Sequence, residues 1–271
     1  MKKFNNKYHA IILSSSYGED EEYLINYLKH LSEICKAIKY QYSVIPVLVF
    51  EKIEEKKKIS IEEKIESQKI DIKASLLINK NGKGFASCLN YGIKNSNSEF
   101  IFRLDTDDRT NQKRIINQLE IMFSQEIDIS SGYMEDQNGQ LLKYPTKVVD
   151  MGLMVAIGTN PIAHPSVCIR RDSLNLLYDK NLEKCEDFDL WIRSFVNDSL
   201  KIKVLKHPIT KYNTLRSFSK DKENAKAQIK IRFKYIKKFT ILTIILLLGV
   251  IPNIFRLILS NNILLFFRRK L

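Results

Sequence analysis

The chain has 271 residues, of which 44% are hydrophobic and 28% are charged. These proportions are typical of a folded protein with a sizeable core, and they exclude a disordered chain. Residues 1–7 are polar and basic, so we expect no secretory signal. The cysteines show no metal-finger spacing, and this favours free thiols in a reducing, cytoplasmic setting: Cys35, Cys88, Cys168 and Cys185.

The net charge of +13 is concentrated near the C-terminus. Residues 220–271 hold 12 Lys and Arg against 2 Asp and Glu, a net charge of +10, which leaves +3 for the first 219 residues. The same tail is the most apolar part of the chain. A basic nucleic-acid-associated protein is therefore disfavoured, because little excess charge lies outside the tail and no nucleic-acid motif is recognisable.

Strand and helix patterns alternate over the first 135 residues and predict an α/β fold with a mostly parallel sheet. Apolar runs predict strands over 8–13, 44–50, 72–78 and 100–104. Apolar stripes predict helices over 20–40, 84–94 and 111–123, and the charged segment 54–68 is either a surface helix or an ordered loop. Further along, the sequence predicts a hairpin turn at 138–139, a short strand over 167–169 and a helix over 186–196.

Three carboxylates, Asp105, Asp107 and Asp108, directly follow the fourth predicted strand. Carboxylates this close repel one another unless a cation lies among them, and Mg²⁺ or Mn²⁺ prefers such oxygen ligands. The loop after a strand is also where open α/β sheets bind ligands. The alternative is an acidic turn in which Asp108 caps the next helix. Thr110 disfavours a calcium loop, which needs Gly at that position. Arg109 disfavours a phosphatase motif, which needs Thr at that position.

Two other segments carry candidate site residues. Glu186 and Asp187 begin a predicted helix, where they either serve as a favourable N-terminal cap or supply a general base that accepts the proton of a hydroxyl group. His164 lies between two prolines, either as a hydrogen-bonding loop residue or as a contact to a diphosphate or a metal.

Together these segments resemble glycosyltransferase family 2, the inverting enzymes with the GT-A fold that build bacterial surface polysaccharides. The resemblance covers about residues 8–215 and rests on four motifs in order: GKGFASCLNYGI over 82–93, SEFIFRLDTDD over 98–108, HPSV over 164–167 and EDFDLWIR over 186–193. Each motif alone is weak, and their order and spacing make the resemblance specific.

The resemblance implies a role for each matching residue. Asp105 and Asp107 would hold Mn²⁺ or Mg²⁺, with Asp105 also touching the nucleotide-sugar donor, and Asp187, or less favourably Glu186, would be the base. The remaining donor contacts would be Ser15 and Tyr17 after the first strand, Lys83, Asn90 and His164. Glu51 stands where the family has an Asp of a Val-Asp-Asp-Gly-Ser-like motif, so UDP is the default nucleotide and dTDP or GDP stays open.

The tail over 220–271 is expected to be a second unit, after a GT-A domain over 1–219. Its uncharged apolar run, 239–251, has 13 residues, whereas a bilayer span needs about 20. Basic residues flank it, as in an interfacial anchor drawn to anionic lipid. A core helix, a dimer contact, a span over 239–259 or a re-entrant pair remain alternatives. We expect a peripheral or monotopic protein on the cytoplasmic face of the plasma membrane.

The expected reaction is therefore transfer of a sugar from a nucleoside-diphosphate sugar to a hydroxyl of a lipid-linked or polysaccharide acceptor. A membrane tail suits a lipid-linked acceptor, because it brings the enzyme to the plane of its substrate. A catalytically silent, membrane-bound scaffold that binds the nucleotide is the remaining alternative, and the altered region around Glu51 keeps it open.

Overall fold

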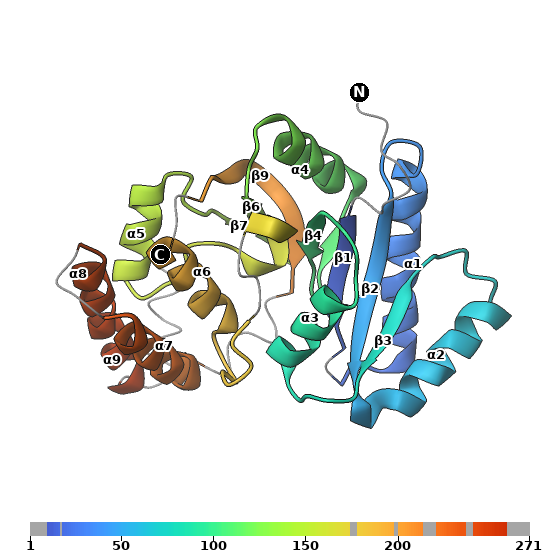
Figure 1. Ribbon diagram of the computed structural model, residues 1–271, viewed down its shortest axis with the longest axis horizontal. Helices are drawn as coiled ribbons and strands as arrows, with labels where there is room; N and C mark the ends of the chain where they lie inside the picture. The colour runs from blue at the N-terminus through green and yellow to red at the C-terminus, as the bar shows by residue number, and fades with distance from the viewer. Residues whose placement is uncertain are drawn as a thin grey trace.

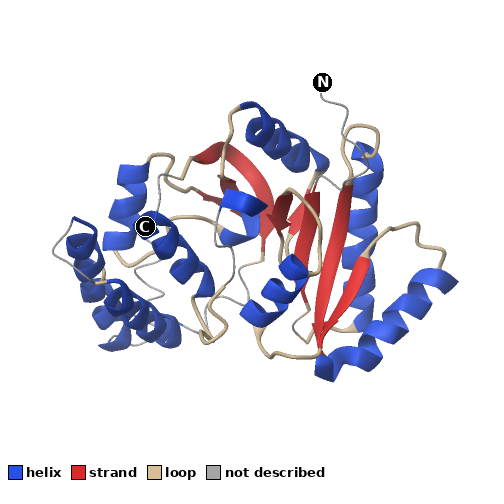
Figure 2. Ribbon diagram, viewed as in Figure 1, coloured by secondary structure: helices blue, strands red, loops and turns tan. Residues whose placement is uncertain are grey.

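The computed structural model describes residues 10–16, 18–173, 178–197, 200–213, 221–236 and 241–258. Within them, one sheet has the strand order β3-β2-β1-β4-β8-β6-β9-β5, and β7 pairs with β6 beside this path. Figure 2 shows the strands in the middle of the molecule, with helices on both sides. The sheet connects the two halves of the chain into one body (Figure 1).

The first half of the chain forms the parallel part of the sheet, in which β2 and β4 flank β1 and β3 pairs with β2. The four strands are β1 Ala10–Ser15, β2 Val44–Glu51, β3 Ser75–Asn79 and β4 Phe100–Arg103. The helices that alternate with them are α1 Glu21–Ile38, α2 Glu55–Ser67, α3 Phe85–Lys94 and α4 Gln112–Ser124. Every strand and helix predicted here is present, with bounds within a few residues.

Side chains of β1 alternate between the two faces of the sheet, as the two-residue period of a strand requires. Ile11 and Leu13 pack with Leu89 of α3, whereas Ala10 and Ile12 pack with α1 and α4. Strands β1 and β4 and most of β2 are buried on both faces, which explains why their sequences are continuous apolar runs, whereas β3 at the edge is half-buried. Their carboxyl ends therefore emerge between packed helices.

The second half adds antiparallel pairs, because β8 runs antiparallel to both β4 and β6, while β9 pairs parallel to β6. The strands are β5 Arg109–Thr110, β6 Ile129–Asp136, β7 Leu141–Leu142, β8 Cys168–Arg170 and β9 Ile202–Tyr212. The helices are α5 Val148–Ala156 and α6 Glu186–Asn197, with 3₁₀ turns at His164–Ser166 and Arg171–Ser173, and a further 3₁₀ turn at Lys52–Glu54 joins β2 to α2 in the first half. The sequence did not predict β6, β9 or α5.

Arg114 of α4 joins the strands beneath the acidic turn. Its buried guanidinium donates hydrogen bonds to the backbone oxygens of Arg103 and Val167 and to the Thr210 hydroxyl, over 2.9, 3.2 and 3.0 Å. It also donates to the Gln118 amide oxygen. A buried charge needs such partners, so this network fixes the end of β4 relative to β9.

The described part of the tail packs onto the rest of the fold. It forms α7 Asp221–Tyr235, α8 Ile241–Leu248 and α9 Val250–Ile258, which lie beside α5 and α6 (Figure 1). Ile231 and Leu246 share a core with Val155 of α5 and Phe188 of α6. Among the described residues, no helix combines the length and apolar character that crossing a bilayer requires.

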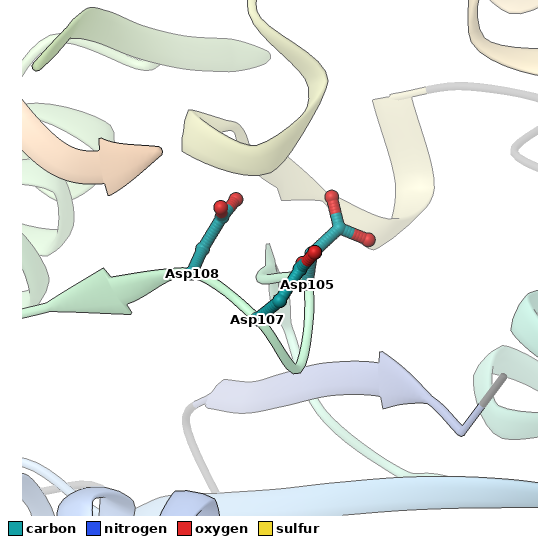
Figure 3. A group of neighbouring side chains, drawn as sticks. All are labelled: Asp105, Asp107 and Asp108. Atoms are coloured by element: carbon teal, nitrogen blue, oxygen red, sulfur yellow. The ribbon is translucent and has the colours of Figure 1, made fainter. Parts of the chain in front are cut away.

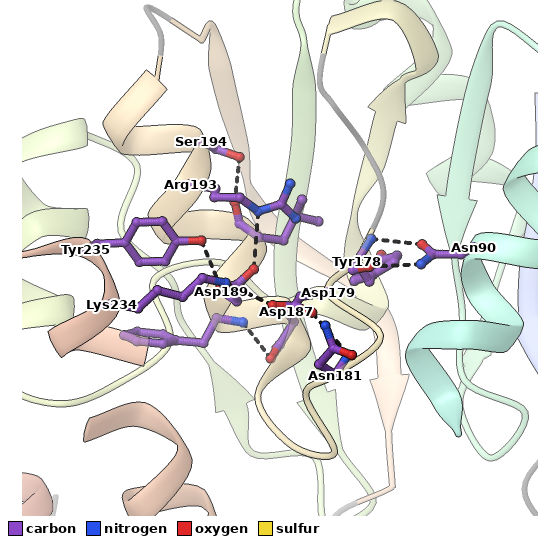
Figure 4. A network of polar contacts seen from close by, with 12 residues as sticks. Asn90, Tyr178, Asp179, Asn181, Asp187, Asp189, Arg193, Ser194, Lys234 and Tyr235 are labelled. Carbon is purple, nitrogen blue, oxygen red and sulfur yellow. Dashed lines mark hydrogen bonds and ion pairs between the residues drawn. The ribbon is translucent and has the colours of Figure 1, made fainter. Parts of the chain in front are cut away.

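Two basic residues of the tail have internal partners. Arg232 is buried with its guanidinium 4.8 Å from the ring centre of Phe188, and Lys234 pairs with Asp179 and Asp189 over 2.9 and 3.0 Å (Figure 4). These contacts tie α7 to the start of α6. Lys237, Lys238 and residues 259–271, which contribute to the predicted anchor, lie outside the described residues.

Candidate active site

The acidic turn gathers three carboxylates at one point. One oxygen each of Asp105, Asp107 and Asp108 can be chosen so that all three lie within 4.8 Å of one another. Figure 3 shows the three side chains on the loop between β4 and β5. Because β4 ends at Arg103 in the middle of the sheet, the cluster lies at the carboxyl edge, where the sequence predicted a metal site.

Asp108 is the most buried member of the cluster. One carboxylate oxygen accepts a hydrogen bond from the backbone N–H of Asn213 over 3.0 Å, and the other has no hydrogen-bond partner. Burial, and then the negative charge of Asp105, raise the pKa of Asp108 to about 8. The alternative role of Asp108 as a helix cap is wrong, because Asn111 caps α4 by accepting from the Arg114 N–H.

These features fit a divalent cation. Three carboxylates this close, one with an unpaired buried oxygen, offer hard oxygen ligands whose mutual repulsion a cation would relieve. Asp105 and Asp107, the ligands that the resemblance implied, would hold the ion together with Asp108, the third carboxylate of the acidic turn.

Arg103 fixes the orientation of Asp105. Its buried guanidinium forms an ion pair with the Asp105 carboxylate and lies 4.7 Å from the ring centre of Phe85. Burial of a cation is costly without a partner, so the pair and the ring hold this side chain in one place. The sequence motif contained Arg103, but nothing in its spacing assigned it this role.

A cleft of about 590 Å³ opens beside the acidic turn. Its walls include Ser15 after β1, the start of α3 at 83–86, Asp105 and Asp107, the segment 182–186 and the end of β9 at 212–213. Three lysines line it as well: Lys83, Lys180 and Lys184. A cleft with carboxylates on one wall and lysines on others suits a metal-bound diphosphate.

Glycine shapes the wall formed by α3. Gly84 precedes the helix with φ +84°, a conformation that favours glycine, and its N–H donates to the Glu51 carboxylate over 2.6 Å. The helix therefore begins at the cleft, where its N-terminal N–H groups favour an anion. Glu51 itself lines a separate hollow of about 530 Å³ with Ser16, Gly18 and Glu54.

A second cavity of about 410 Å³ adjoins the cleft. The two share Phe85, Asp105, Glu186 and Tyr212, so they meet at the acidic turn. The residues that line only the second cavity include Tyr144, Asn160, Ile162, His164 and Asp187. Asp107 and Asp187 thus lie in two hollows that share walls, on the same side of the molecule.

Glu186 and Asp187 begin α6 at this junction. Glu186 lines both cavities, and its pKa is raised to about 7 by burial and then by the charge of Asp187. Asp187 accepts hydrogen bonds from the Asn160 side chain and the Phe188 N–H over 2.5 and 2.7 Å. Burial raises the pKa of Asp187 as well. The two carboxyl groups therefore differ in their surroundings. Asp187 is held by two hydrogen bonds, whereas Glu186 lies on the wall that the two cavities share.

His164 lines the second cavity. Among the described contacts, no hydrogen bond joins it to the acidic cluster. Its Nε2 shares a hydrogen bond of 2.8 Å with the Tyr178 hydroxyl, and its ring lies edge-on to Phe85 and Trp191. Burial, and then the charge of Arg103, lower its pKa well below the usual value. A neutral, hydrogen-bonded imidazole agrees with the loop-residue alternative.

Only some of the other residues predicted to contact the nucleotide-sugar donor line the cleft. Ser15 and Lys83 line the cleft, whereas Tyr17 lies outside the described residues. Asn90 lines neither cavity, because its amide is used in two 2.8 Å hydrogen bonds to the backbone of Tyr178 (Figure 4). Asn90 thus holds the residue that supports His164 rather than facing the cleft.

Several residues of the site were missed by sequence reasoning. Glu19 is buried at the cleft and accepts from the Thr106 hydroxyl over 3.0 Å, while Tyr144, Asn160 and Tyr212 line the second cavity. They come from loops and from strand ends that carry no periodic signal. Of these residues, Glu19 is the one with a signal in the sequence, because it is an acidic residue only four positions after the apolar strand β1.

Comparisons with known proteins indicate what this chain is similar to. No family model matches the chain. An uncharacterized glycosyltransferase of Methanocaldococcus jannaschii is 26% identical over 245 residues, which cover 84% of this chain and 80% of the relative.

Solved structures share the fold. S. aureus TarS, residues 1–349, has a TM-score of 0.63 at 17% identity and covers 91% of this chain and 72% of its own. The mannosyltransferase PcManGT from Pyrobaculum calidifontis, solved with GDP-Man and Mn²⁺, has a TM-score of 0.63 at 12% identity, with 93% and 72% covered. Glucosyl-3-phosphoglycerate synthase from Mycobacterium tuberculosis, solved with Mn²⁺ and UDP, has a TM-score of 0.55 at 12% identity, with 83% and 77% covered.

The fold is therefore the GT-A fold that the motifs predicted, with a curled, parallel-rich sheet and flanking helices. The sequence relative and the structural neighbours are glycosyltransferases, and the predicted resemblance to this class of enzyme is confirmed.

Proposed function

We propose that this chain transfers a sugar from a nucleoside-diphosphate sugar, by default a UDP-sugar, to an acceptor hydroxyl with inversion at the anomeric carbon. The observation that carries the proposal is the meeting of two cavities at Asp105 and Glu186, one beside the carboxylate cluster and the other beside Asp187. An in-line displacement needs such an arrangement, because the acceptor hydroxyl attacks the anomeric carbon of the donor sugar from the side opposite to the departing nucleoside diphosphate.

The donor occupies the 590 Å³ cleft in this proposal. Its diphosphate lies near the carboxylate cluster, the start of α3 and Lys83, and Ser15 approaches the nucleoside. Neighbours of the same fold were solved with UDP-GlcNAc, GDP-Man and UDP, which supports a nucleotide-sugar donor without selecting the base. Glu51 accepts a hydrogen bond from the backbone N–H of Gly84, before α3, and this contact does not select among UDP, dTDP and GDP.

Asp105, Asp107 and Asp108 would hold the cofactor, Mn²⁺ or Mg²⁺, and two of the neighbours were solved with Mn²⁺. When bound, such an ion neutralises the negative charge that develops on the departing diphosphate. The chain supplies the rest: Arg103 orients Asp105, and the lysines of the cleft add positive charge around the leaving group.

The acceptor enters the 410 Å³ cavity, where Asp187 accepts the proton of its attacking hydroxyl. The hydrogen bond from Asn160 keeps the Asp187 carboxylate oriented. Glu186 at the shared wall is the second candidate for the base, since its pKa of about 7 allows it to hold or release a proton near neutrality. Tyr144 and Tyr212 offer aromatic faces of the kind on which sugar rings pack.

The proposed acceptor is a lipid-linked or polysaccharide glycan, and the proposed location is the cytoplasmic face of the plasma membrane. The basic, apolar tail supports this part of the proposal.

A thermal-shift screen of sugar nucleotides with and without Mn²⁺ tests the proposal. The expected result is a rise in melting temperature with one nucleotide family that depends on Mn²⁺. Stabilisation by nucleic acid but by no sugar nucleotide would contradict it. A catalytically silent scaffold is the second candidate, favoured by the departure at Glu51, and would bind the donor without ever releasing nucleoside diphosphate in the presence of membrane acceptors.

A further inference from the structure

The tail exposes an unusual row of large apolar side chains. Within each of two helices they are spaced three or four residues apart, and each has between 42% and 72% of its surface exposed: Ile244, Leu247 and Leu248 on α8, and Ile251, Phe255 and Ile258 on α9. We call this set the apolar stripe. Soluble proteins rarely expose this many large apolar side chains on two neighbouring helices, so the set indicates a binding surface.

Buried residues on the opposite side fix the direction of the stripe. Leu246 of α8 lies in the core with Val155 and Phe188, and Asn253 of α9 is buried with its amide donating to Gln228 of α7 over 3.3 Å. The helices therefore cannot rotate to hide the stripe without losing these contacts. The exposed side is a fixed feature of the folded protein.

Helix α5 extends the apolar surface toward the acceptor cavity. It packs against α8, where Gly152 faces Ile245, and it exposes Leu153 and Ile157. In the chain, α5 lies between Tyr144 and Asn160, which both line the 410 Å³ cavity. The exposed apolar residues of α5 and two residues that line the proposed acceptor cavity thus belong to one short segment, 144–160.

Positive charge accompanies the stripe. Helix α7 packs along α9 and exposes Lys222, Lys226 and Lys230, four residues apart. In the sequence, the 13 residues after Ile258 end with Arg268, Arg269 and Lys270 before the final Leu271. Exposed apolar side chains on α8 and α9, with exposed lysines on the adjoining α7, suit a bilayer with anionic headgroups. A second copy of the chain is a poorer occupant, because a two-fold contact would bring two such basic tails together.

We propose that the apolar stripe and the exposed residues of α5 dock on an anionic bilayer surface and hold the 410 Å³ cavity next to the lipid. The link to the acceptor rests on the proposed function, whereas the bilayer contact itself does not. The lysines of α7 contribute attraction that salt weakens, and the stripe contributes apolar burial that salt does not weaken.

Tryptophan fluorescence of the full chain gives a direct test. The chain has one tryptophan, Trp191, which is buried. Ile251→Trp therefore places a reporter on the stripe, and Ile59→Trp is the matched control, since Ile59 lies on α2 with 48% exposed against 53% for Ile251. Vesicles of phosphatidylglycerol and brominated phosphatidylcholine are expected to quench the Ile251→Trp reporter and not the Ile59→Trp reporter.

Vesicle sedimentation measures the strength of the contact. Ile251→Asp is expected to lower the partition coefficient on the same unbrominated vesicles by about tenfold, and Ile59→Asp to leave it unchanged. Circular dichroism and Ile251→Ser, which adds no charge, separate a lost contact from a lost fold. Nucleotide binding in solution is read separately, so that its failure would count against the proposed function and not against the docking surface.

Three outcomes would overturn the inference: equal quenching of both reporters, absence of wild-type binding to anionic vesicles, or a wild-type dimer by light scattering that Ile251→Asp converts to a monomer. The last outcome would assign the stripe to contact between two copies of the chain.

Discussion

The side-chain amide of Asn160 donates a hydrogen bond of 2.5 Å to the carboxylate of Asp187. This contact joins the loop after α5 to the first turn of α6, and the second oxygen of Asp187 accepts from the N–H of Phe188. A carboxylate held by two donors keeps one orientation toward the cavity. That is what a base needs if it is to meet an acceptor hydroxyl in the same place in each turnover.

Asp187→Asn should abolish most of the transfer, because the amide keeps the shape of the side chain but cannot accept the proton. We expect kcat to fall by about 10²–10⁴-fold, with the affinity for the donor nearly unchanged. Release of nucleoside diphosphate in the presence of a membrane acceptor fraction gives the rate, and calorimetry gives the donor affinity. Wild-type turnover by this variant would remove Asp187 from the role, and a larger loss in Glu186→Gln would transfer the role to Glu186.

The rate should depend on pH through Glu186. Burial, and then the charge of Asp187, raise the pKa of Glu186 to about 7, so the group is protonated below this pH and ionised above it. If its carboxylate form supports transfer, kcat/KM rises toward a plateau above about pH 7. Glu186→Gln should flatten this rise. A profile that is the same in both proteins would exclude Glu186 from the titration.

The same shift has a consequence for stability. Because the pKa of Glu186 in the folded protein lies above its ordinary value of 4.5, the folded state holds the proton more tightly than the unfolded state. The contribution to stability is complete below pH 4.5 and is lost as pH rises through about 7. Glu186→Gln should therefore gain stability relative to the wild type over this range, by at most about 3 kcal/mol, as measured by urea unfolding. A constant difference from pH 4.5 to 8 would contradict the raised pKa.

Arg103→Met should both destabilise the protein and weaken the metal site. The change leaves Asp105 without its buried partner, which costs up to about 3 kcal/mol and frees the carboxylate to move. Arg170→Met is the matched control, since Arg170 also pairs with a carboxylate, Glu99, and lies 4.9 Å from the ring centre of Phe100, away from both cavities. Urea unfolding gives stability, and calorimetry gives Mn²⁺ affinity. Unchanged Mn²⁺ affinity in Arg103→Met would show that Arg103 is only structural.

The parallel half of the fold was predictable because its central strands are buried on both faces and its helices are buried on one. The apolar run of β2 around Leu48 and the apolar face of α1 that includes Leu28 and Leu31 follow directly from that burial. In contrast, β9 reads as IKVLKHPITKY, with lysines, a histidine and Pro208, and its pairing with β6 shifts register near that proline. A half-exposed, irregular strand gives no clean alternation, and α5 is too short and uniformly apolar to show a helical period.

The site was predictable where the chain itself brings residues together. Asp105 and Asp107 are neighbours in sequence, as are Glu186 and Asp187, so their clustering needed no knowledge of the fold. Asn160 and Asp187 are 27 residues apart in the sequence, and no local sequence pattern predicts such a contact. Asn90 shows the opposite case, because a residue next to a motif is directed by packing toward Tyr178.

The binding of UDP to the full chain, with Mn²⁺ and with a chelator, tests the central claim most directly. Calorimetry on the wild type, on Asp107→Ala and on the surface control Asp71→Ala compares loss of a carboxylate from the cluster with loss of one from an exposed site. We predict that Mn²⁺ tightens UDP binding at least about tenfold in the wild type and in Asp71→Ala, and that Asp107→Ala loses this gain. Equal Mn²⁺-dependent affinity in Asp107→Ala would contradict the assignment of the acidic turn.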